Sequence, residues 1–238
     1  SDIIFFWVAR MIMFSKELYN IDPFKKVFLH GPILGKDAKK MGKSKGNAID
    51  PFSIIQEYGV DVLRFSLLWN ASSDQPVMIK DKVDYKISRS LEIKLWNLLR
   101  YILSLVITED FLYTGIVYDC NNVFNDFILF ELLNQFTFYH KAIDIFDFMS
   151  VAKSLYNFIK DTFCNDYLEV VKLTLTNEDK NIIIFTFIHI LQMLHPLMPF
   201  VTETCWSLLG NALINFPKSI LLTKFQDIEI NKNSKDLD

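Results

Sequence analysis

The spacing of apolar residues after residue 80 constrains the fold most. From there on they recur every three or four positions, which places them on one face of a helix. The first such stretch contains Val83, Ile87, Leu91, Leu95, Leu98, Leu99 and Ile102. We predict further helices over residues 122–143, 150–173, 178–194 and 199–209, with Thr176 capping the third and Gly210 as the last C-cap. Such helices pack as a bundle, so residues 76–238 are predicted to form an α-helical domain.

The first 75 residues follow a different pattern. Residues 3–18 are mostly helix formers and predict a helix, whereas "KKVFLHGPIL" (25–34) predicts a short buried strand around Val27, Phe28 and Leu29. Two short helices are predicted next, over 51–58 and 60–69. The first is capped by Asp50, followed by Pro51, and stopped by Gly59. Helix, strand and loop together predict part of an α/β sheet.

Composition narrows the class of protein. With 238 residues, of which 51% are apolar, the chain can bury a large core. The apolar run at residues 3–9 is too short to cross a bilayer and lacks the order of a secretory signal, so we expect no membrane partner. Cys120, Cys164 and Cys205 form no C-x-x-C pair, which favours the reducing cytoplasm and disfavours a structural metal. His189 and His195 are expected at the core edge or at helix ends.

Charge is unevenly distributed along the chain. Residues 1–100 hold 16 Lys and Arg against 11 Asp and Glu, whereas residues 101–238 hold 9 against 17 and contain no arginine. Two modules are therefore predicted. A nucleic-acid surface, if present, should lie mainly in the first 100 residues.

The stretch "KKMGKSKGN" (39–47) resembles the end of a phosphate-binding P-loop, but the spacing excludes that motif. The earlier glycine is replaced by Asp37, and the next helix signal comes only at Asp50. What remains is a cationic loop with glycines, able to close ammonium groups over a polyphosphate. The alternative is a solvated lysine-rich turn. The loop contains Lys36, Lys39, Lys40, Lys43 and Lys45 with Gly35, Gly42 and Gly46.

Six stretches in order resemble valyl-tRNA synthetases, a family of class I aminoacyl-tRNA synthetases. "FFWVARM" favours this family over the isoleucine and leucine families, which stay as alternatives. The resemblance covers nearly the whole chain and implies a remnant of a Rossmann-like α/β domain (residues 1–75) followed by an anticodon-binding bundle (76–238), a mainly α fold. The stretches are "DIIFFWVARMIM", "FLHGPILGKDAKKMGKSKGNAIDP", "YGVDVLRFSLL", "KLWNLLRY", "FCNDYLE" and "LHPLMPFVTETCW".

The resemblance also implies roles for residues of the loop. The family signature Lys-Met-Ser-Lys-Ser matches Lys40 to Ser44, with Gly42 in place of the middle serine. Lys40 and Lys43 are then the catalytic residues, acting on the triphosphate of ATP, with Mg²⁺ as its counter-ion. The residues expected to bind ATP are Asp2, His30, Gly31, Met41, Gly42 and Ser44.

The family implies valine, ATP and the tRNA for valine as partners, together with an N-terminal half of the catalytic domain. We expect the chain alone to be catalytically inactive and limited to tRNA binding. A non-catalytic helical module that binds tRNA or protein is the second hypothesis. Asp2 could equally be a helix N-cap, and His30 a structural histidine. Phe5, Phe6 and Trp7 are expected to be core residues, with the amino-acid pocket as the alternative. The tRNA-binding candidates, which could equally be ordinary exposed charges, are Lys86, Arg89, Lys94 and Arg100.

Overall fold

A computed structural model describes most of the chain. The described residues are 3–35, 41–42, 46–47, 49–71, 77–78, 81–107, 111–114 and 122–224, without the side chains of 77–78 and 81–84. The chain divides into two compact units, residues 1–30 and 31–238. The side chain of Val83, Cys120 and all residues after 224 therefore lie outside what is described.

The first unit is a single helix followed by an extended segment. A π-helical turn, η1 (Ile4–Val8), continues into α1 (Ala9–Tyr19), which ends at Asn20 in the left-handed conformation (φ 53°). The predicted helix over 3–18 is confirmed. None of its residues is buried: Trp7 is 65% exposed and Phe5 72%. The expectation that they are core residues is wrong for this unit, because one helix has no second layer to cover it.

The predicted buried strand over 25–34 is largely wrong. Val27 and Leu29 are exposed, and only Ile33–Leu34 forms a strand, β1. β1 pairs in parallel with β2 (Val77–Met78), Ile33 opposite Val77. A parallel strand needs hydrogen-bonding neighbours, and β2 is the neighbour that the described residues provide, over two residues. This short pair is the α/β part of a mainly α fold.

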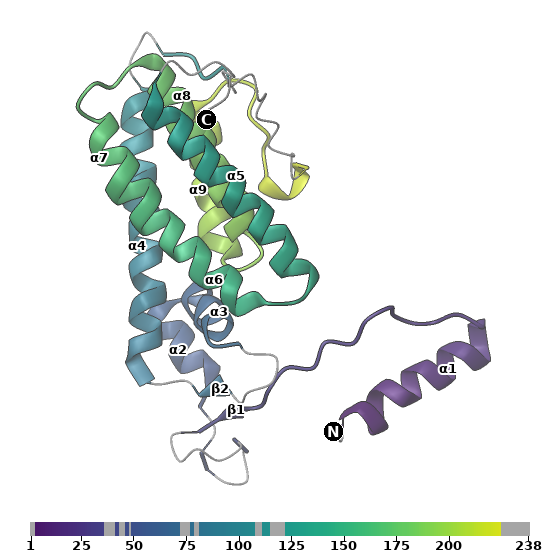
Figure 1. Ribbon diagram of the computed structural model, residues 1–238. Helices are drawn as coiled ribbons and strands as arrows, with labels where there is room; N and C mark the ends of the chain where they lie inside the picture. Colours follow the sequence, from purple (N-terminus) through teal and green to yellow (C-terminus); the bar gives the residue numbers. More distant parts are fainter. Residues whose placement is uncertain are drawn as a thin grey trace, which may run out of the picture. The chain divides into compact units, whose positions relative to one another are not determined.

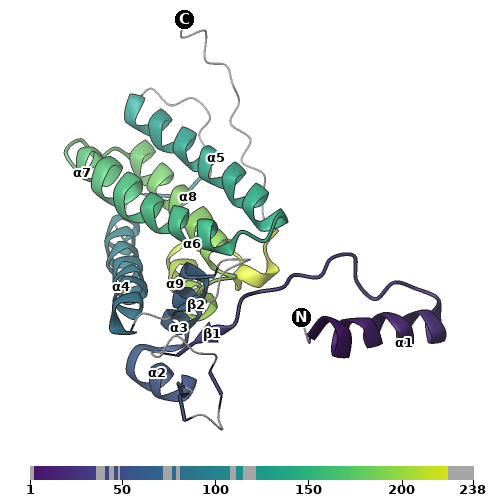
Figure 2. The same cartoon turned by 60° about the horizontal axis from the view of Figure 1, so that its bottom comes forward.

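Two short helices follow β1, as predicted. α2 (Pro51–Tyr58) begins at Asp50, whose side chain accepts a hydrogen bond from the Phe52 amide at 3.1 Å. Gly59, at φ 98°, separates it from α3 (Val60–Trp69). This positive φ strains any residue with a side chain, so glycine is needed here. β1, β2, α2 and α3 lie at one end of the bundle (Figure 2).

The remaining elements form the helical bundle (Figure 1). α6, the π-helical η3 and α7 form one continuous helical column, which matches the helix predicted over 150–173. Asn122 and Thr176 cap α5 and α8, and Thr176 forms a capping box with Asp179. The elements are α4 (Asp81–Val106), α5 (Val123–Asp144), α6 (Phe148–Asn157), η3 (Phe158–Tyr167), α7 (Leu168–Val171), α8 (Asn177–Leu194), α9 (Pro199–Ala212) and the 3₁₀ turn η4 (Ile220–Leu222).

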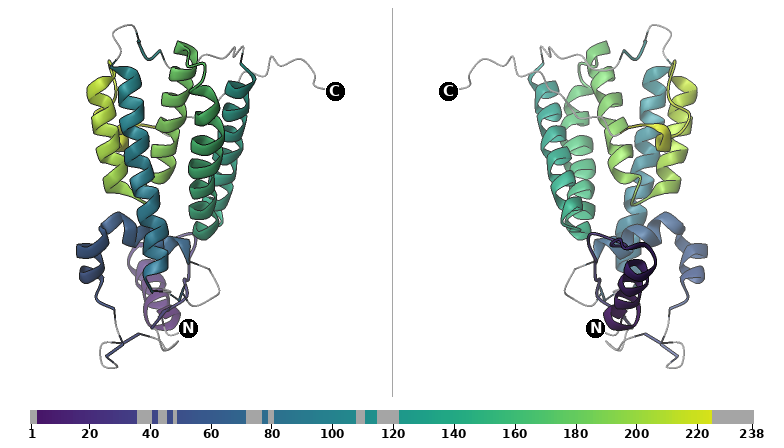
Figure 3. Two further views of the ribbon diagram at one scale, coloured as in Figure 1. Left: turned by 90° about the vertical axis from the view of Figure 1, so that its left-hand side faces the viewer. Right: turned by 90° about the vertical axis from the view of Figure 1, so that its right-hand side faces the viewer.

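The central helix of the bundle is α8, which packs against α4, α5, α6 and α9 (Figure 3). It is buried almost throughout, as expected for a helix that is apolar on every side. From α4, the predicted face enters this core: Leu95 and Ile102 are fully buried. The prediction of a mainly α fold is therefore confirmed.

A buried polar cluster crosses the core. The Asp179 carboxylate accepts hydrogen bonds from Asn125 at 2.7 Å, from Asn122 at 3.3 Å and from the Thr176 amide at 2.8 Å. Asn125 in turn accepts one from the Tyr167 hydroxyl at 2.7 Å. The cluster joins α5, η3 and α8, and its satisfied hydrogen bonds offset the cost of burying it.

Gly210 does not end the last long helix, contrary to the prediction. α9 continues to Ala212, with Leu213 as its C-cap. A Cβ at Gly210 would lie 3.1 Å from Cδ1 of Phe216, whose ring packs on Trp206 with centroids 4.5 Å apart. Glycine is therefore needed at position 210 because the chain after α9 packs closely against the helix there.

Candidate functional site

The described part of the cationic loop is tied down at its base. The Met41 amide donates to the Ile33 carbonyl at 3.4 Å, which brings the loop back alongside β1. The Gly42 amide donates to Oδ1 of Asn47 at 3.0 Å, and Gly46 between them has φ 66°. Two hydrogen bonds thus hold the adjacent residues Met41 and Gly42, one to β1 and the other to Asn47.

Half of the eight predicted ATP-binding and catalytic residues lie outside the described residues. Lys40, Lys43, Ser44 and Asp2 lie outside the described residues, as do Lys36, Lys39 and Lys45. Gly31, Met41 and Gly42 are half-buried at or near the base of the loop, whereas His30 is exposed and belongs to the first unit. Their roles in ATP binding stay predictions.

The predicted tRNA-binding residues all lie on α4. Lys86, Arg89 and Arg100 are exposed, and Lys94 is half-buried. The guanidinium of Arg89 forms an ion pair with Glu92 at 2.6 Å, one turn further along the helix. This pairing makes Arg89 less available for a phosphate than a cation facing water, but the four assignments stay predictions.

Sequence reasoning missed a buried carboxylate on α3. Asp61 accepts hydrogen bonds from the amides of Phe200 at 3.3 Å and Val201 at 2.6 Å. These amides belong to the first turn of α9, whose N-cap residue, Met198, makes no side-chain cap of its own. Burial raises the pKa of Asp61, while the two amides and the nearby Arg64 act in the opposite direction. A side chain of α3 therefore caps α9.

Arg64, one turn further along α3, contacts the chain segment that connects α8 to α9. Its Nη2 donates to the Pro196 carbonyl at 2.9 Å and its Nε to the Leu197 carbonyl at 3.4 Å. These carbonyls follow the end of α8. We call Asp61 and Arg64 the α3 clamp: the acid meets a helix N-terminus and the cation a helix C-terminus, the favourable placement for both charges. A carboxylate within the apolar helix "VDVLRF" was the signal available in the sequence.

His195 lies at a helix end, as predicted, whereas His189 is buried in the core and not at its edge, contrary to the prediction. Nδ1 of His189 is 2.9 Å from the Phe185 carbonyl inside α8, and His195 follows α8 with Nδ1 2.8 Å from the Thr202 hydroxyl. Burial lowers the pKa of both. Within the described residues, no three His, Cys, Asp or Glu side chains gather to hold a metal ion. Nor is any described helix long and apolar enough to cross a membrane.

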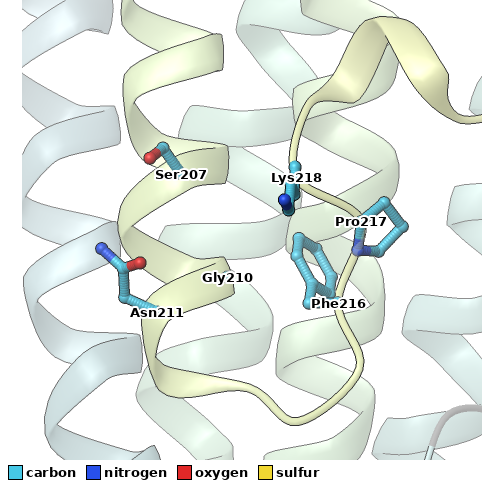
Figure 4. Close-up of a pocket in the computed structure, with 6 residues that line it drawn as sticks. All are labelled: Ser207, Gly210, Asn211, Phe216, Pro217 and Lys218. Atoms are coloured by element: carbon cyan, nitrogen blue, oxygen red, sulfur yellow. The ribbon is translucent and has the colours of Figure 1, made fainter.

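A shallow pocket of about 260 Å³ opens beside the end of α9. Figure 4 shows Phe216 and Lys218 of the returning chain facing Ser207, Gly210 and Asn211 on the helix. The pocket contains none of the predicted site residues.

The free energy of unfolding should fall as the pH drops from 7 to 5.5, in part because of His189. The unfolded histidine takes up a proton near pH 6.5, whereas burial holds the folded pKa lower. The unfolded state therefore binds more protons, and His189 can contribute at most about 1.4 kcal/mol per pH unit. Denaturant unfolding at several pH values measures this slope. His189→Gln should flatten it, and an equal slope in the two proteins would contradict the assignment.

Comparisons with known proteins agree with this arrangement. Residues 1–91 match the family model of class I tRNA synthetases (I, L, M and V), and residues 126–237 match the anticodon-binding domain of tRNA ligases. The chain belongs to the class I tRNA synthetases. In this synthetase chain, the α3 clamp joins the region matched by the first model to the region matched by the second.

The similar sequences are bacterial valine–tRNA ligases. The Fervidobacterium nodosum enzyme is 36% identical over 97% of this chain and 26% of its own length, and the Thermotoga maritima enzyme 35% over 96% and 26%. The Staphylococcus epidermidis enzyme is 37% identical over 86% and 24%. The synthetase chain thus spans about a quarter of the length of these relatives. The resemblance found in the sequence motifs is confirmed.

A solved structure shows the same fold. In the ternary complex of Agrobacterium radiobacter K84 agnB2 LeuRS with tRNA and LeuAMS, the protein superposes with a TM-score of 0.67 at 19% identity. The match covers 88% of the synthetase chain and 26% of the LeuRS chain. At this identity the likeness concerns the fold alone.

Proposed function

We propose that the chain is the part of a valine–tRNA ligase that carries the signature loop and the anticodon-binding bundle. The observation that supports this most is the 36% identity with a valine–tRNA ligase over 97% of the chain. Identity that runs through both the loop and the bundle favours one inherited protein over a helical module that has acquired a lysine-rich turn.

The proposed reaction has two steps. A carboxylate oxygen of valine attacks the α-phosphorus of ATP, the bond to the β-phosphate bridging oxygen breaks, and pyrophosphate leaves. A ribose hydroxyl at the end of the tRNA then attacks the carbonyl carbon of valyl-adenylate and expels AMP. Negative charge grows on the pyrophosphate during the first step, so cations placed there lower the barrier.

Within this proposal, the loop brings cations to the triphosphate. Lys43 is assigned to the leaving pyrophosphate, and Lys40 to the phosphates and to loop closure. The hydrogen bonds of the Met41 and Gly42 amides support this, because they fix the two residues that lie between Lys40 and Lys43 in the sequence. Gly42 removes a side chain next to Lys43 and should raise the entropy lost on closing.

The remaining partners follow from the same proposal. Mg²⁺ is expected to arrive bound to ATP, and Asp2, His30, Gly31 and Ser44 are proposed to contact the nucleotide. A further polypeptide is proposed to complete the nucleotide site, because within the described residues β1 and β2 form a pair of two residues each. We place the protein in the cytoplasm, where the buried free thiols of Cys164 and Cys205 stay reduced.

The purified 238-residue chain should show no valine-dependent exchange of pyrophosphate into ATP. Its two-residue strands provide too small a sheet to hold ATP and valine together. Exchange of labelled pyrophosphate, measured with and without valine, tests this directly, with a complete valine–tRNA ligase as the positive control. Exchange above background that requires valine would contradict the proposal that a further polypeptide completes the site.

A further inference from the structure

The bundle carries a row of lysines that lie on aromatic rings. Nζ of Lys153 on α6 lies 5.9 Å from the ring centre of Trp69, and Nζ of Lys160 on η3 lies 5.4 Å from that of Tyr156. The rings of Trp69 and Tyr156 meet edge to face at 5.2 Å. Two cations from one helical column are therefore held over a continuous pair of rings.

The row continues toward α7. Nζ of Lys172 lies 5.2 Å from the ring centre of Tyr101 on α4, and Lys172 also pairs with Glu169 at 2.5 Å. Lys172 lowers the pKa of Glu169 through this hydrogen bond, and Lys94 acts in the same direction more weakly. Lys94 lies on α4 seven residues before Tyr101, and so on the same face of that helix. Figure 1 and the left view of Figure 3 show α4 beside the column of α6, η3 and α7. We define the lysine strip as Lys94, Lys153, Lys160 and Lys172.

The charge of the strip differs from that of the region around it. Residues 101–238 hold 9 lysines against 17 acids, and three of those lysines belong to the strip. Glu169 neutralises Lys172, while Asp161, next to Lys160, accepts a hydrogen bond from Asn165 at 3.4 Å. Three cations, Lys94, Lys153 and Lys160, therefore remain without an ion pair within the described residues.

Several features of the strip fit a nucleic-acid backbone. Lys153 and Lys160 are two helical turns apart, about 10 Å along the axis, and so can meet phosphates spaced along one strand. The rings beneath the ammonium groups of Lys153, Lys160 and Lys172 restrict these side chains before binding and reduce the ordering needed in the complex. The rings also offer apolar edges to ribose. An acidic peptide would not require this regular row.

We propose that the lysine strip binds the phosphate backbone of the RNA partner, in addition to the contacts predicted on α4. This rests on the proposed function, which supplies tRNA as that partner. Lys94 belongs to both sets and links them. Because the contacts are to phosphates, the strip contributes affinity and orientation but no selection of sequence.

The test measures RNA binding by the 238-residue chain at several salt concentrations. The probes are the tRNA for valine and an unrelated RNA hairpin. The triple variant Lys94→Gln, Lys153→Gln, Lys160→Gln should lose about one unit of salt slope for each lysine, and at least tenfold in affinity at about 0.1 M salt, for both RNAs. Thermal unfolding should show that the variant is folded, since none of the three side chains is fully buried.

The matched control is Lys141→Gln, Lys218→Gln, Lys224→Gln, which removes the same charge from exposed positions outside the strip. It should retain most of the affinity and slope. Equal losses of affinity in both triple variants would contradict the proposed role of the lysine strip, because net charge alone would then explain the binding. An unchanged slope in the strip variant would also overturn it, while leaving the proposed function intact.

Two further outcomes separate the strip from the proposed function. If the chain binds both RNAs equally and the strip variant loses both, the strip is supported and recognition of the tRNA for valine by this chain is not. If the wild-type chain binds neither RNA, both the strip and the proposed tRNA binding are wrong.

Discussion

Replacing Lys43 by alanine in a complete enzyme should slow valine activation by about a hundredfold or more. The proposed contact of Lys43 is with charge that develops on pyrophosphate only in the transition state. Its loss should therefore lower kcat and kcat/KM of activation together and leave the affinity for valine nearly unchanged. Transfer from preformed valyl-adenylate to tRNA should stay nearly intact, because pyrophosphate has already left.

Lys36→Ala is the matched control, since it removes the same charge from the same loop outside the signature. It should cost several-fold at most. Single-turnover measurements of activation and of transfer, in both variants, separate the two steps. Similar damage from both substitutions, or a transfer step slowed as much as activation, would show that the loop acts as a diffuse patch of charge and not through Lys43.

Asp61→Ala should destabilise the folded chain by about 3 kcal/mol. The substitution leaves two amides in the first turn of α9, those of Phe200 and Val201, without their charged acceptor. It also removes the carboxylate next to Arg64, which contacts the same segment between α8 and α9. Equilibrium unfolding in denaturant measures the loss, and an unchanged m-value would show that the two states are otherwise the same.

Asp50→Ala provides the comparison for Asp61. Asp50 also caps a helix through one amide, that of Phe52, but it is exposed and caps its own helix. Its replacement should cost about 1 kcal/mol. If Asp61→Ala were no more harmful than Asp50→Ala, the α3 clamp would contribute little to the stability of the fold.

The parts of the fold that depend on local pattern were predictable. α2 and α3 begin and end where Asp50, Gly59 and the apolar spacing place them, and the capping box of α8 starts at the predicted Thr176. Long amphipathic helices repeat their signal over many turns, so errors at single positions cancel. The same argument explains why the bundle was recognised without any knowledge of how its helices pack.

Features that depend on distant parts of the chain were not predictable. The amides that meet Asp61 lie 139 and 140 positions away in the sequence, and no local pattern identifies them. Glycine is a residue type that often ends helices, but Gly210 is needed because the ring of Phe216 leaves no room for a side chain there. The apolar run around Val27 fits a strand locally, yet a strand forms only where a neighbouring strand can pair with it.

The residues of the candidate site were predicted from resemblance to family motifs more than from their charge and spacing. The residue pattern indicated a cationic loop able to meet polyphosphate, but the specific roles of Lys40 and Lys43 came from resemblance to a family signature. The lysine strip had no such signal, because its rings and cations come from α3, α4, α6, η3 and the end of α7 and meet only in the folded bundle.

The buried cluster around Asp179 bears on how uniquely the bundle is assembled. Apolar side chains attract one another without direction, so a core made mainly of leucine and isoleucine could tolerate helices shifted by a turn. Asp179, Asn125 and Tyr167 do not tolerate such a shift, because it would separate their hydrogen bonds and leave buried polar atoms unpaired. The cluster thus selects one register of α5, η3 and α8 from several of similar apolar burial. Its contribution is discrimination between alternative packings, and it keeps the surfaces that these helices carry in fixed relation to one another.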